Sequence, residues 1–99
     1  MRYYRAVIAS FKCKQTEGIF NRRRSGKLPR DLQRRARMKL LMLDAATDLK
    51  DLRAPPGNRL ERLKGARKGQ YSIRINDRWR ICFRWLSSNA YDVQIIDYH

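Results

Sequence analysis

The sequence predicts an α+β fold in which two N-terminal helices pack on one face of a mostly antiparallel, twisted sheet. Three observations support this prediction. Apolar residues recur at helical spacings before residue 54, they alternate after residue 59, and the segment APPGN at 54–58 separates the two patterns. Helices followed by a run of strands are typical of an α+β domain. A chain of 99 residues with 42% hydrophobic content suits one core, so we expect a single domain over 1–99.

The first predicted elements lie before residue 30. The stretch VIASFK at 7–12 alternates apolar with small or polar residues, which is typical of a short, half-buried strand. Thr16 precedes EGIFNRRR and is expected to be the N-cap of a short helix, which Ser25 and Gly26 interrupt.

A second helix is predicted after Pro29, which suits the first turn of a helix. One apolar stripe runs along it, formed by Leu32, Ala36, Leu40 and Leu43. The opposite face carries Arg34, Arg35, Arg37 and Lys39. We expect the stripe to face the sheet and the cations to face solvent or an anionic partner.

Short strands are predicted at 60–64, 71–75, 79–85 and 91–96, with a basic loop at 65–69 that contains Arg67 and Lys68. The apolar residues of the second and third strands share one face only if their loop has an odd number of residues. A three-residue loop at 76–78 pairs Ile75 with Trp79, Ile73 with Ile81 and Tyr71 with Phe83.

The same register places arginines together on the other face of the sheet. Arg74 lies across from Arg80, and Arg84 follows on that side. Opposed like charges cost about 0.2–1 kcal/mol, so stability alone does not explain them. An external phosphate or carboxylate would, because it matches the guanidinium fork. The alternative is that these side chains splay into water at little cost.

The last strand is predicted to pair Trp85 with Tyr91 across a five-residue loop. That register brings Asp97 beside Trp79, near Arg74, Arg78 and Arg80. Strict alternation puts Tyr98 on the arginine face and Asp97 and His99 on the other face. The strand must therefore end or twist near Asp97 if all three side chains are to meet.

The charge of the chain favours an anionic partner. Lys and Arg number 24 against 9 Asp and Glu, which leaves a formal net charge of +15. Between Arg22 and Lys39 the only acid is Asp31. Nucleic acid would bind such a surface favourably, because binding releases its counterions. The simpler alternative is that the charge only keeps the protein soluble.

Cysteine usage and hydropathy limit the remaining classes. Cys13 and Cys82 form no CxxC or Cys/His cluster, so we expect buried free thiols and no metal site. No stretch approaches the roughly 20 apolar residues that span a bilayer, and the N-terminus lacks the apolar core of a signal peptide. We therefore expect a cytoplasmic protein with no membrane partner.

The segment LDAATDLKDLRAPPGNRLERLKGARKGQYSIRINDRWRICFRW, together with the terminal DYH, closely resembles HigB-type toxins of the RelE/ParE superfamily, particularly the GraT-like branch. The opening SFK, a following Thr and IF also fit. The resemblance covers nearly the whole chain from about Ile8, so residues 1–7 look like an N-terminal extension. The combination of LKG, YSI, WRI and DYH is specific.

The resemblance implies a toxin that cleaves mRNA within the translating ribosome and so inhibits translation and growth, without metal or cofactor. It also implies neutralisation by a cognate helix-turn-helix antitoxin of the HigA type, with DNA contacted only through the toxin–antitoxin complex. By motif, the functional positions are Lys64, Arg80, Asp97, Tyr98 and His99. Some relatives carry a histidine where Glu61 stands and an arginine near Asn76. The acid/base assignment therefore stays open, with Glu61 as a candidate and Arg74 or Arg78 as the replacement cation.

The chemistry of such cleavage fits these residues. A ribose 2′-OH must lose a proton and attack the adjacent phosphate, and the 5′ oxygen must gain one. His99 has the pKa range for proton transfer near neutrality. Arg80, whose side chain is expected to leave the core face, and Lys64 would stabilise the phosphorane. Asp97 would orient a partner, and Tyr98 would stack on a base or hydrogen-bond near the scissile group.

Further contacts to RNA or the ribosome are predicted at Arg34, Arg35, Arg37, Arg67, Lys68, Arg74, Arg78 and Arg84. Two other functions remain open: a non-catalytic basic RNA-binding protein and a ParE-like inhibitor of DNA gyrase. The DYH terminus and the LKG lysine favour the ribonuclease over the gyrase inhibitor.

Overall fold

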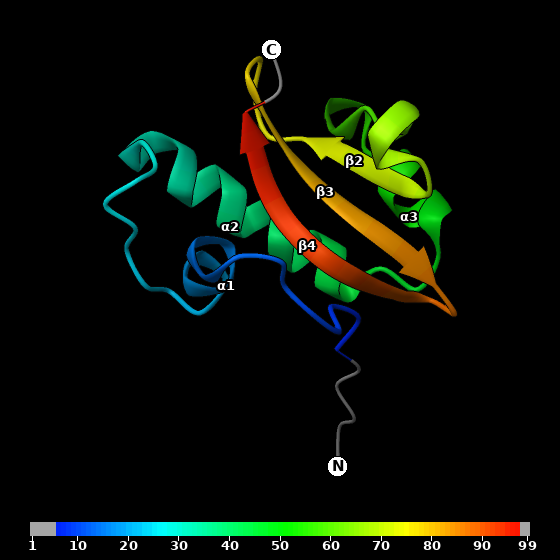
Figure 1. The fold of residues 1–99 in the computed structure, drawn as a ribbon, viewed down its shortest axis with the longest axis horizontal. Helices are drawn as coiled ribbons and strands as arrows, with labels where there is room; N and C mark the ends of the chain where they lie inside the picture. The colour runs from blue at the N-terminus through cyan, green and yellow to red at the C-terminus, as the bar shows by residue number, and fades with distance from the viewer. Residues whose placement is uncertain (1–5, 98–99) are drawn as a thin grey trace.

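The computed structural model describes residues 6–97. The helices are α1 (Lys14–Phe20), α2 (Arg30–Ala45) and α3 (Leu49–Arg53), with short 3₁₀ helices η1 (Pro56–Asn58) and η2 (Gly65–Arg67). The strands are β1 (Glu61–Arg62), β2 (Gln70–Arg74), β3 (Trp79–Leu86) and β4 (Asn89–Asp97). In this part of the chain they form one antiparallel sheet in the order β1-β2-β3-β4. Figure 1 shows α2 crossing behind β4, with α1 beside it, and α3 on the other side of the molecule near β2. The predicted α+β class is confirmed.

The core lies between α2 and the sheet. The apolar stripe predicted for α2 is fully buried, and it comprises Leu32, Ala36, Leu40 and Leu43. From the sheet, Ile73, Ile81, Phe83 and Val93 join the same cluster. The helical spacing of α2 and the alternation of the strands therefore meet in one apolar layer.

The prediction of a strand at 7–12 is wrong. Isolated parallel bridges join Ile8 to Ala90 and Phe11 to Val93, and no ladder forms between them. The Asp44 carboxylate accepts the backbone N–H groups of Val7 and Ile8 at 2.9 Å each. Side-chain acceptors that take backbone donors compete with a regular ladder. The segment therefore ties the end of α2 to β4, and Val7 itself is part of the core.

Thr16 does not cap α1, contrary to the prediction. The helix begins at Lys14 with Cys13 as its N-cap, and Thr16 lies buried in the first turn. Its hydroxyl oxygen accepts the backbone N–H of Ile95 in β4 at 3.0 Å. A backbone N–H that is shielded from water needs an acceptor, and for the partly buried Ile95 the acceptor is a helix side chain instead of another strand.

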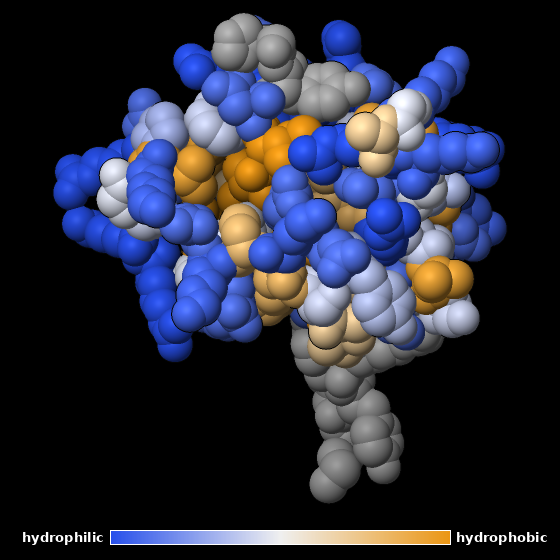
Figure 2. All heavy atoms as spheres, in the orientation of Figure 1, coloured by the Kyte–Doolittle hydropathy of each residue, from blue (hydrophilic) through white to orange (hydrophobic). Residues whose placement is uncertain are grey.

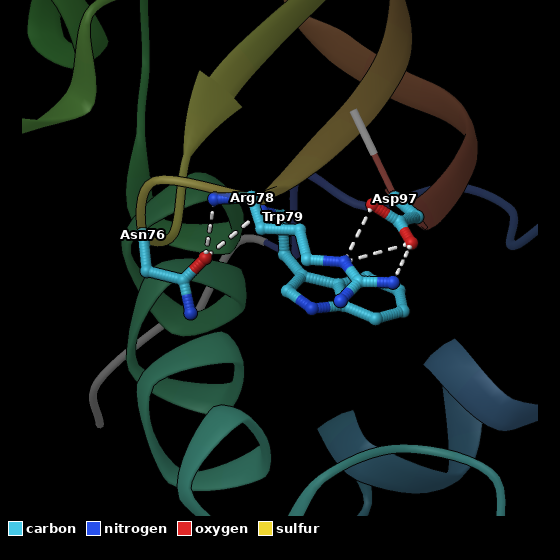
Figure 3. Close-up of polar contacts among 4 residues, drawn as sticks. All are labelled: Asn76, Arg78, Trp79 and Asp97. Atoms are coloured by element: carbon cyan, nitrogen blue, oxygen red, sulfur yellow. Dashed lines mark hydrogen bonds and ion pairs between the residues drawn. The ribbon is translucent and has the colours of Figure 1, made fainter. Parts of the chain in front are cut away.

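The central hairpin has the predicted register. Ile73 pairs with Ile81, Tyr71 with Phe83, and Arg74 with Arg80. The turn is closed by Asn76, whose side-chain oxygen accepts the backbone N–H groups of Arg78 and Trp79 at 2.9 Å each (Figure 3). Asparagine is favoured in turns because its side chain makes this contact.

The second hairpin has a different turn from the one predicted. Trp85 pairs with Ala90, and Ser87 and Ser88 form a two-residue turn with φ values of 50° and 64°. The register then shifts between Cys82 and Arg84, which marks a β-bulge on the opposite strand. The bulge adds the residue that the short turn leaves out. Asp97 accordingly pairs with Trp79, as predicted.

In the described part of the chain, no helix is long and apolar enough to cross a membrane.

Candidate functional site

Asp97 and Arg78 form the best-defined polar contact at the carboxyl end of β4. The Nε of Arg78 donates to both carboxylate oxygens of Asp97 at 2.9 Å. A terminal guanidinium nitrogen of Arg78 also donates to Asp97 Oδ2 at 2.7 Å (Figure 3). These hydrogen bonds raise the pKa of Arg78 above its ordinary value. The guanidinium also lies over the Trp79 ring, 5.7 Å from its centroid. The contact holds the end of β4 against the turn between β2 and β3.

Tyr98 and His99, two of the predicted catalytic residues, lie outside the described residues. The predicted convergence of Asp97, Tyr98 and His99 therefore stays a prediction.

Arg80 lies on the sheet face opposite Ile81, as its register requires, but its side chain is only 7% exposed. Its Nε donates to Ser72 Oγ at 2.7 Å, and a terminal nitrogen donates to the backbone oxygens of Ser72 and Arg59. The carboxylate of Glu61 lies 3.7 Å away. The guanidinium is therefore held by the protein itself, a role that alternation along β3 does not reveal.

The opposed arginines of this face each have an acidic neighbour. Arg74 pairs with Asp77, and Arg84 lies 3.5 Å from Asp92. With Glu61 beside Arg80, the chain supplies carboxylates at all three positions. The arginine register alone does not require an external anion.

Lys64 lies far from Asp97 along the sheet. It is exposed and directly follows the buried Leu63, whose N–H donates to the Gln70 oxygen at the start of β2. Gln70 pairs with Arg84, whereas Asp97 pairs with Trp79 at the other end of β3. At about 3.3 Å per residue, those two ends are roughly 16 Å apart. The structure therefore does not bring Lys64 next to Asp97.

The basic loop after Lys64 is compact. Arg67 donates to the Gln70 side chain at 3.4 Å, and Lys68 is exposed. Gly65 and Gly69 have positive φ values of 64° and 92°, a conformation that favours glycine.

The cations of α2 line a groove beside the loop that joins α1 and α2. Figure 2 shows hydrophilic side chains covering the side of the molecule where this loop and the start of α2 lie in Figure 1. A pocket of about 260 Å³ is lined there by Ile19, Arg22, Arg23, Arg24, Gln33, Arg34, Arg37 and Met38. Arg34 is exposed, whereas the Nε of Arg37 is buried with no hydrogen-bond partner in the described structure. The groove has many donors for an anionic partner.

Lys39 is a cation that the sequence analysis did not assign to the site. It lies in a second pocket, of about 280 Å³, lined by Arg35, Met38, Lys39, Gly57, Arg74 and Ile75. Burial lowers the pKa of Lys39, and the positive charges of Arg35 and Arg74 lower it further. Its ammonium donates to the side-chain oxygen of Asn58. The helical spacing of Arg35 and Lys39 was visible in the sequence, but the approach of Arg74 was not.

Among residues 6–97, no group of three or more His, Cys, Asp or Glu side chains is placed to hold a metal ion. Cys82 is buried in the sheet, and burial raises the pKa of its thiol.

Comparison with known proteins identifies the family. The family described as "RelE-like toxin of type II toxin-antitoxin system HigB" matches residues 9–99. Toxin HigB-1 of Vibrio cholerae serotype O1 is 39% identical over 85 residues, which is 85% of this chain and 90% of that protein. Endoribonuclease HigB of Proteus vulgaris is 32% identical over 93 residues, 94% of this chain and 100% of that protein. The chain therefore belongs to the HigB-like family of RelE-like toxins of type II toxin-antitoxin systems.

Proposed function

We propose that this toxin is an endoribonuclease that cleaves mRNA on the translating ribosome and thereby inhibits translation and growth. The observation that carries the proposal is the match, over the full length of the relative, to a protein named an endoribonuclease. The net charge of +15 supports an RNA substrate, because counterion release favours its binding to polyanions. The proposed cleavage uses no metal or cofactor.

His99 is the proposed proton-transfer residue, since an imidazole titrates near neutrality. Asp97 is the proposed positioning residue. Its bidentate contact with Arg78 keeps the end of β4 in place, which supports that role. Tyr98 is proposed to stack on a base or to hydrogen-bond near the scissile phosphate.

Arg80 and Lys64 are proposed to act on phosphates of the RNA strand. Because Arg80 is nearly covered, its cation would act on the substrate mainly through the electrostatic field. Lys64 is exposed after β1, beside the start of β2, so we propose that it contacts a phosphate away from Asp97. Glu61, beside Arg80, remains the alternative acid/base group.

A type II toxin has an antitoxin partner, and we propose a helix-turn-helix protein of the HigA type, through which the complex contacts DNA. We further propose that the basic face of α2 binds ribosomal RNA. Arg34, Arg35 and Arg37 belong to this face. Further RNA contacts are proposed at cations of the sheet and its loops, namely Arg67, Lys68, Arg74, Arg78 and Arg84. A cytoplasmic location follows from the proposed substrate.

The proposal is tested in a reconstituted translation system with defined mRNA and purified toxin. New mRNA 5′ ends are mapped by primer extension, with and without ribosomes. The parent protein is expected to cut only when ribosomes are present. His99→Ala is expected to lower the cleavage rate by about 10²-fold, the usual scale for one proton-transfer group. Lys50→Ala, which changes an exposed lysine on α3, is the matched control and is expected to cut at the parental rate.

The alternatives predict different results in this assay and in cells. A non-catalytic RNA-binding protein would inhibit translation without producing new 5′ ends. A gyrase inhibitor would spare translation and leave cleaved DNA in cells. Parental cleavage by His99→Ala would contradict the role of the imidazole and transfer the acid/base work to Lys64, Glu61 or Tyr98.

A further inference from the structure

The pocket between α2 and the end of β2 gathers three cations from two elements. Arg35 and Lys39 are one helical turn apart on α2, and Arg74 comes from β2. Gly57 and Ile75 contribute to the lining, and the pocket holds about 280 Å³. Like charges that converge in this way raise the free energy of the empty site unless an anion joins them.

The ammonium of Lys39 is held in place before any ligand binds. It donates to the side-chain oxygen of Asn58, and Asn58 is fully buried. The Asn58 amide nitrogen in turn donates to the backbone oxygen of Leu52 at 3.0 Å. This chain of contacts fixes the position of the positive charge, so little side-chain freedom is lost on binding.

Among the described residues, the acidic partner of Arg74 compensates its charge only weakly at this pocket. Arg74 pairs with Asp77, whose side chain is 99% exposed, and such surface pairs contribute little. Arg80, in contrast, is enclosed by its hydrogen bonds and by Glu61. The lowered pKa of Lys39 reports the same situation, since burial, Arg35 and Arg74 all disfavour its charged form. An incoming anion would relieve the repulsion among the three cations.

We propose that Arg35, Lys39 and Arg74 bind one phosphate group, with Lys39 as a phosphate-binding residue. The tetrahedral oxygens of phosphate accept from several directions, which suits one ammonium and two guanidinium forks arriving from different elements. The site deepens the proposed function, on which its assignment to an RNA backbone phosphate rests. Free phosphate has the same chemistry, and the two sources are separated below.

RNA binding tests the first source. An uncleavable 2′-O-methyl oligoribonucleotide is titrated by fluorescence anisotropy over a range of NaCl concentrations. Lys39→Gln is expected to reduce the salt-dependence slope by about 0.7, the value for one phosphate contact on a single strand. Lys39→Arg keeps the charge and is expected to keep the slope. Lys50→Gln removes one exposed positive charge elsewhere and is expected to leave the slope near that of the parent.

Inorganic phosphate tests the second source. The pKa of the Lys39 ammonium is followed by NMR in phosphate and in chloride of equal ionic strength. A bound anion favours the charged form, so phosphate is expected to raise this pKa, and less so in Arg74→Gln. A rise with phosphate but an unchanged RNA slope would assign the site to free phosphate.

Three results would overturn the proposal. Lys39→Gln could leave the RNA slope unchanged while phosphate also leaves the pKa of Lys39 in the parent protein unchanged. Or Lys50→Gln could lower the slope equally, which would reduce the effect to general charge. Alternatively, Lys39→Gln could weaken only the affinity for the antitoxin, which would assign the pocket to a protein carboxylate. If Lys39→Gln does not fold, Arg35→Gln tests the same pocket from the exposed face of α2. Since the oligonucleotide is uncleavable, none of these results depends on whether the toxin cleaves mRNA.

Discussion

Truncation of Arg80 is expected to destabilise the fold as well as to impair function. The side chain is 7% exposed, and its guanidinium donates to Ser72 Oγ at 2.7 Å and to the backbone oxygens of Ser72 and Arg59. Arg80→Ala leaves these acceptors, and the carboxylate of Glu61, without their cationic partner. The alternation along β3 predicts that this side chain faces a ligand, and it therefore does not predict the loss of stability.

The magnitude follows from the hydrogen bonds. A bond to a charged group contributes about 1.5–3 kcal/mol, and an acceptor left unsatisfied costs about 1–3 kcal/mol. Relief of the Arg80 desolvation offsets part of this loss. We expect Arg80→Ala to lower the free energy of unfolding by about 3 kcal/mol, or the melting temperature by roughly 10–25 °C in a domain of this size. Arg80→Lys keeps the charge and one donor, so about half that loss is expected.

Urea unfolding followed by circular dichroism measures the effect, with Arg84→Ala as the matched control. The Arg84 side chain is 45% exposed and lies 3.5 Å from Asp92, so its removal is expected to cost less than about 1 kcal/mol. Growth inhibition by each variant must be compared at equal soluble protein. Unfolding of Arg80→Ala at the parental urea concentration would refute the structural role derived for this arginine.

Two further predictions concern pH and thiol reactivity. Hydrogen bonds from the backbone and side chain of Thr47 lower the pKa of Asp51 in the α3 capping box. The ionised Asp51 carboxylate therefore stabilises the folded state above the ordinary aspartate pKa, and this contribution is lost as pH falls through the lowered pKa of Asp51. Asp51→Asn is expected to melt below the parent at pH 7 and to match it near pH 2, whereas a constant difference would contradict this linkage. Burial raises the pKa of Cys82, so iodoacetamide is expected to alkylate Cys13 in the native protein and Cys82 only after unfolding, as read by mass spectrometry.

The sheet was largely predictable because the alternation of apolar residues determines whether the loop between two strands has an odd or an even number of residues. Ile73 and Ile81 share a face only when the loop between their strands has an odd number of residues, and the register expected for a three-residue loop is observed. The second hairpin was less predictable. Its two-residue turn shifts the pairing of β4 by one residue from the predicted register, and the bulge shifts it back by one. The two shifts cancel before Asp97. The position of Asp97 was therefore predicted correctly from an incorrect turn, and no local pattern marks the positive φ of 53° at Asp92.

The candidate site was less predictable than the sheet because its contacts come from segments far apart in the chain. The backbone oxygen of Arg59, which covers Arg80, belongs to an irregular stretch with no period. Thr16 is of a residue type that often caps helices, yet in the structure its hydroxyl accepts the backbone N–H of Ile95 instead. Lys39 lies on a helix face that the sequence did predict, but the approach of Arg74 depends on how β2 ends beside α2.

The N-terminal segment that runs beside β4 determines how this sheet can associate with other chains. The N–H groups of Ala90 and Val93 donate to the oxygens of Val7 and Ser10, and that of Ile95 donates to Thr16. An outer strand with its donors already occupied offers no template for a foreign strand. Over this stretch, strand addition by a partner or by a second copy of the toxin is blocked. β1, two residues long, offers little pairing length at the other margin. A partner that binds at these margins of the sheet is therefore expected to do so through side chains, and acidic side chains would complement a net charge of +15.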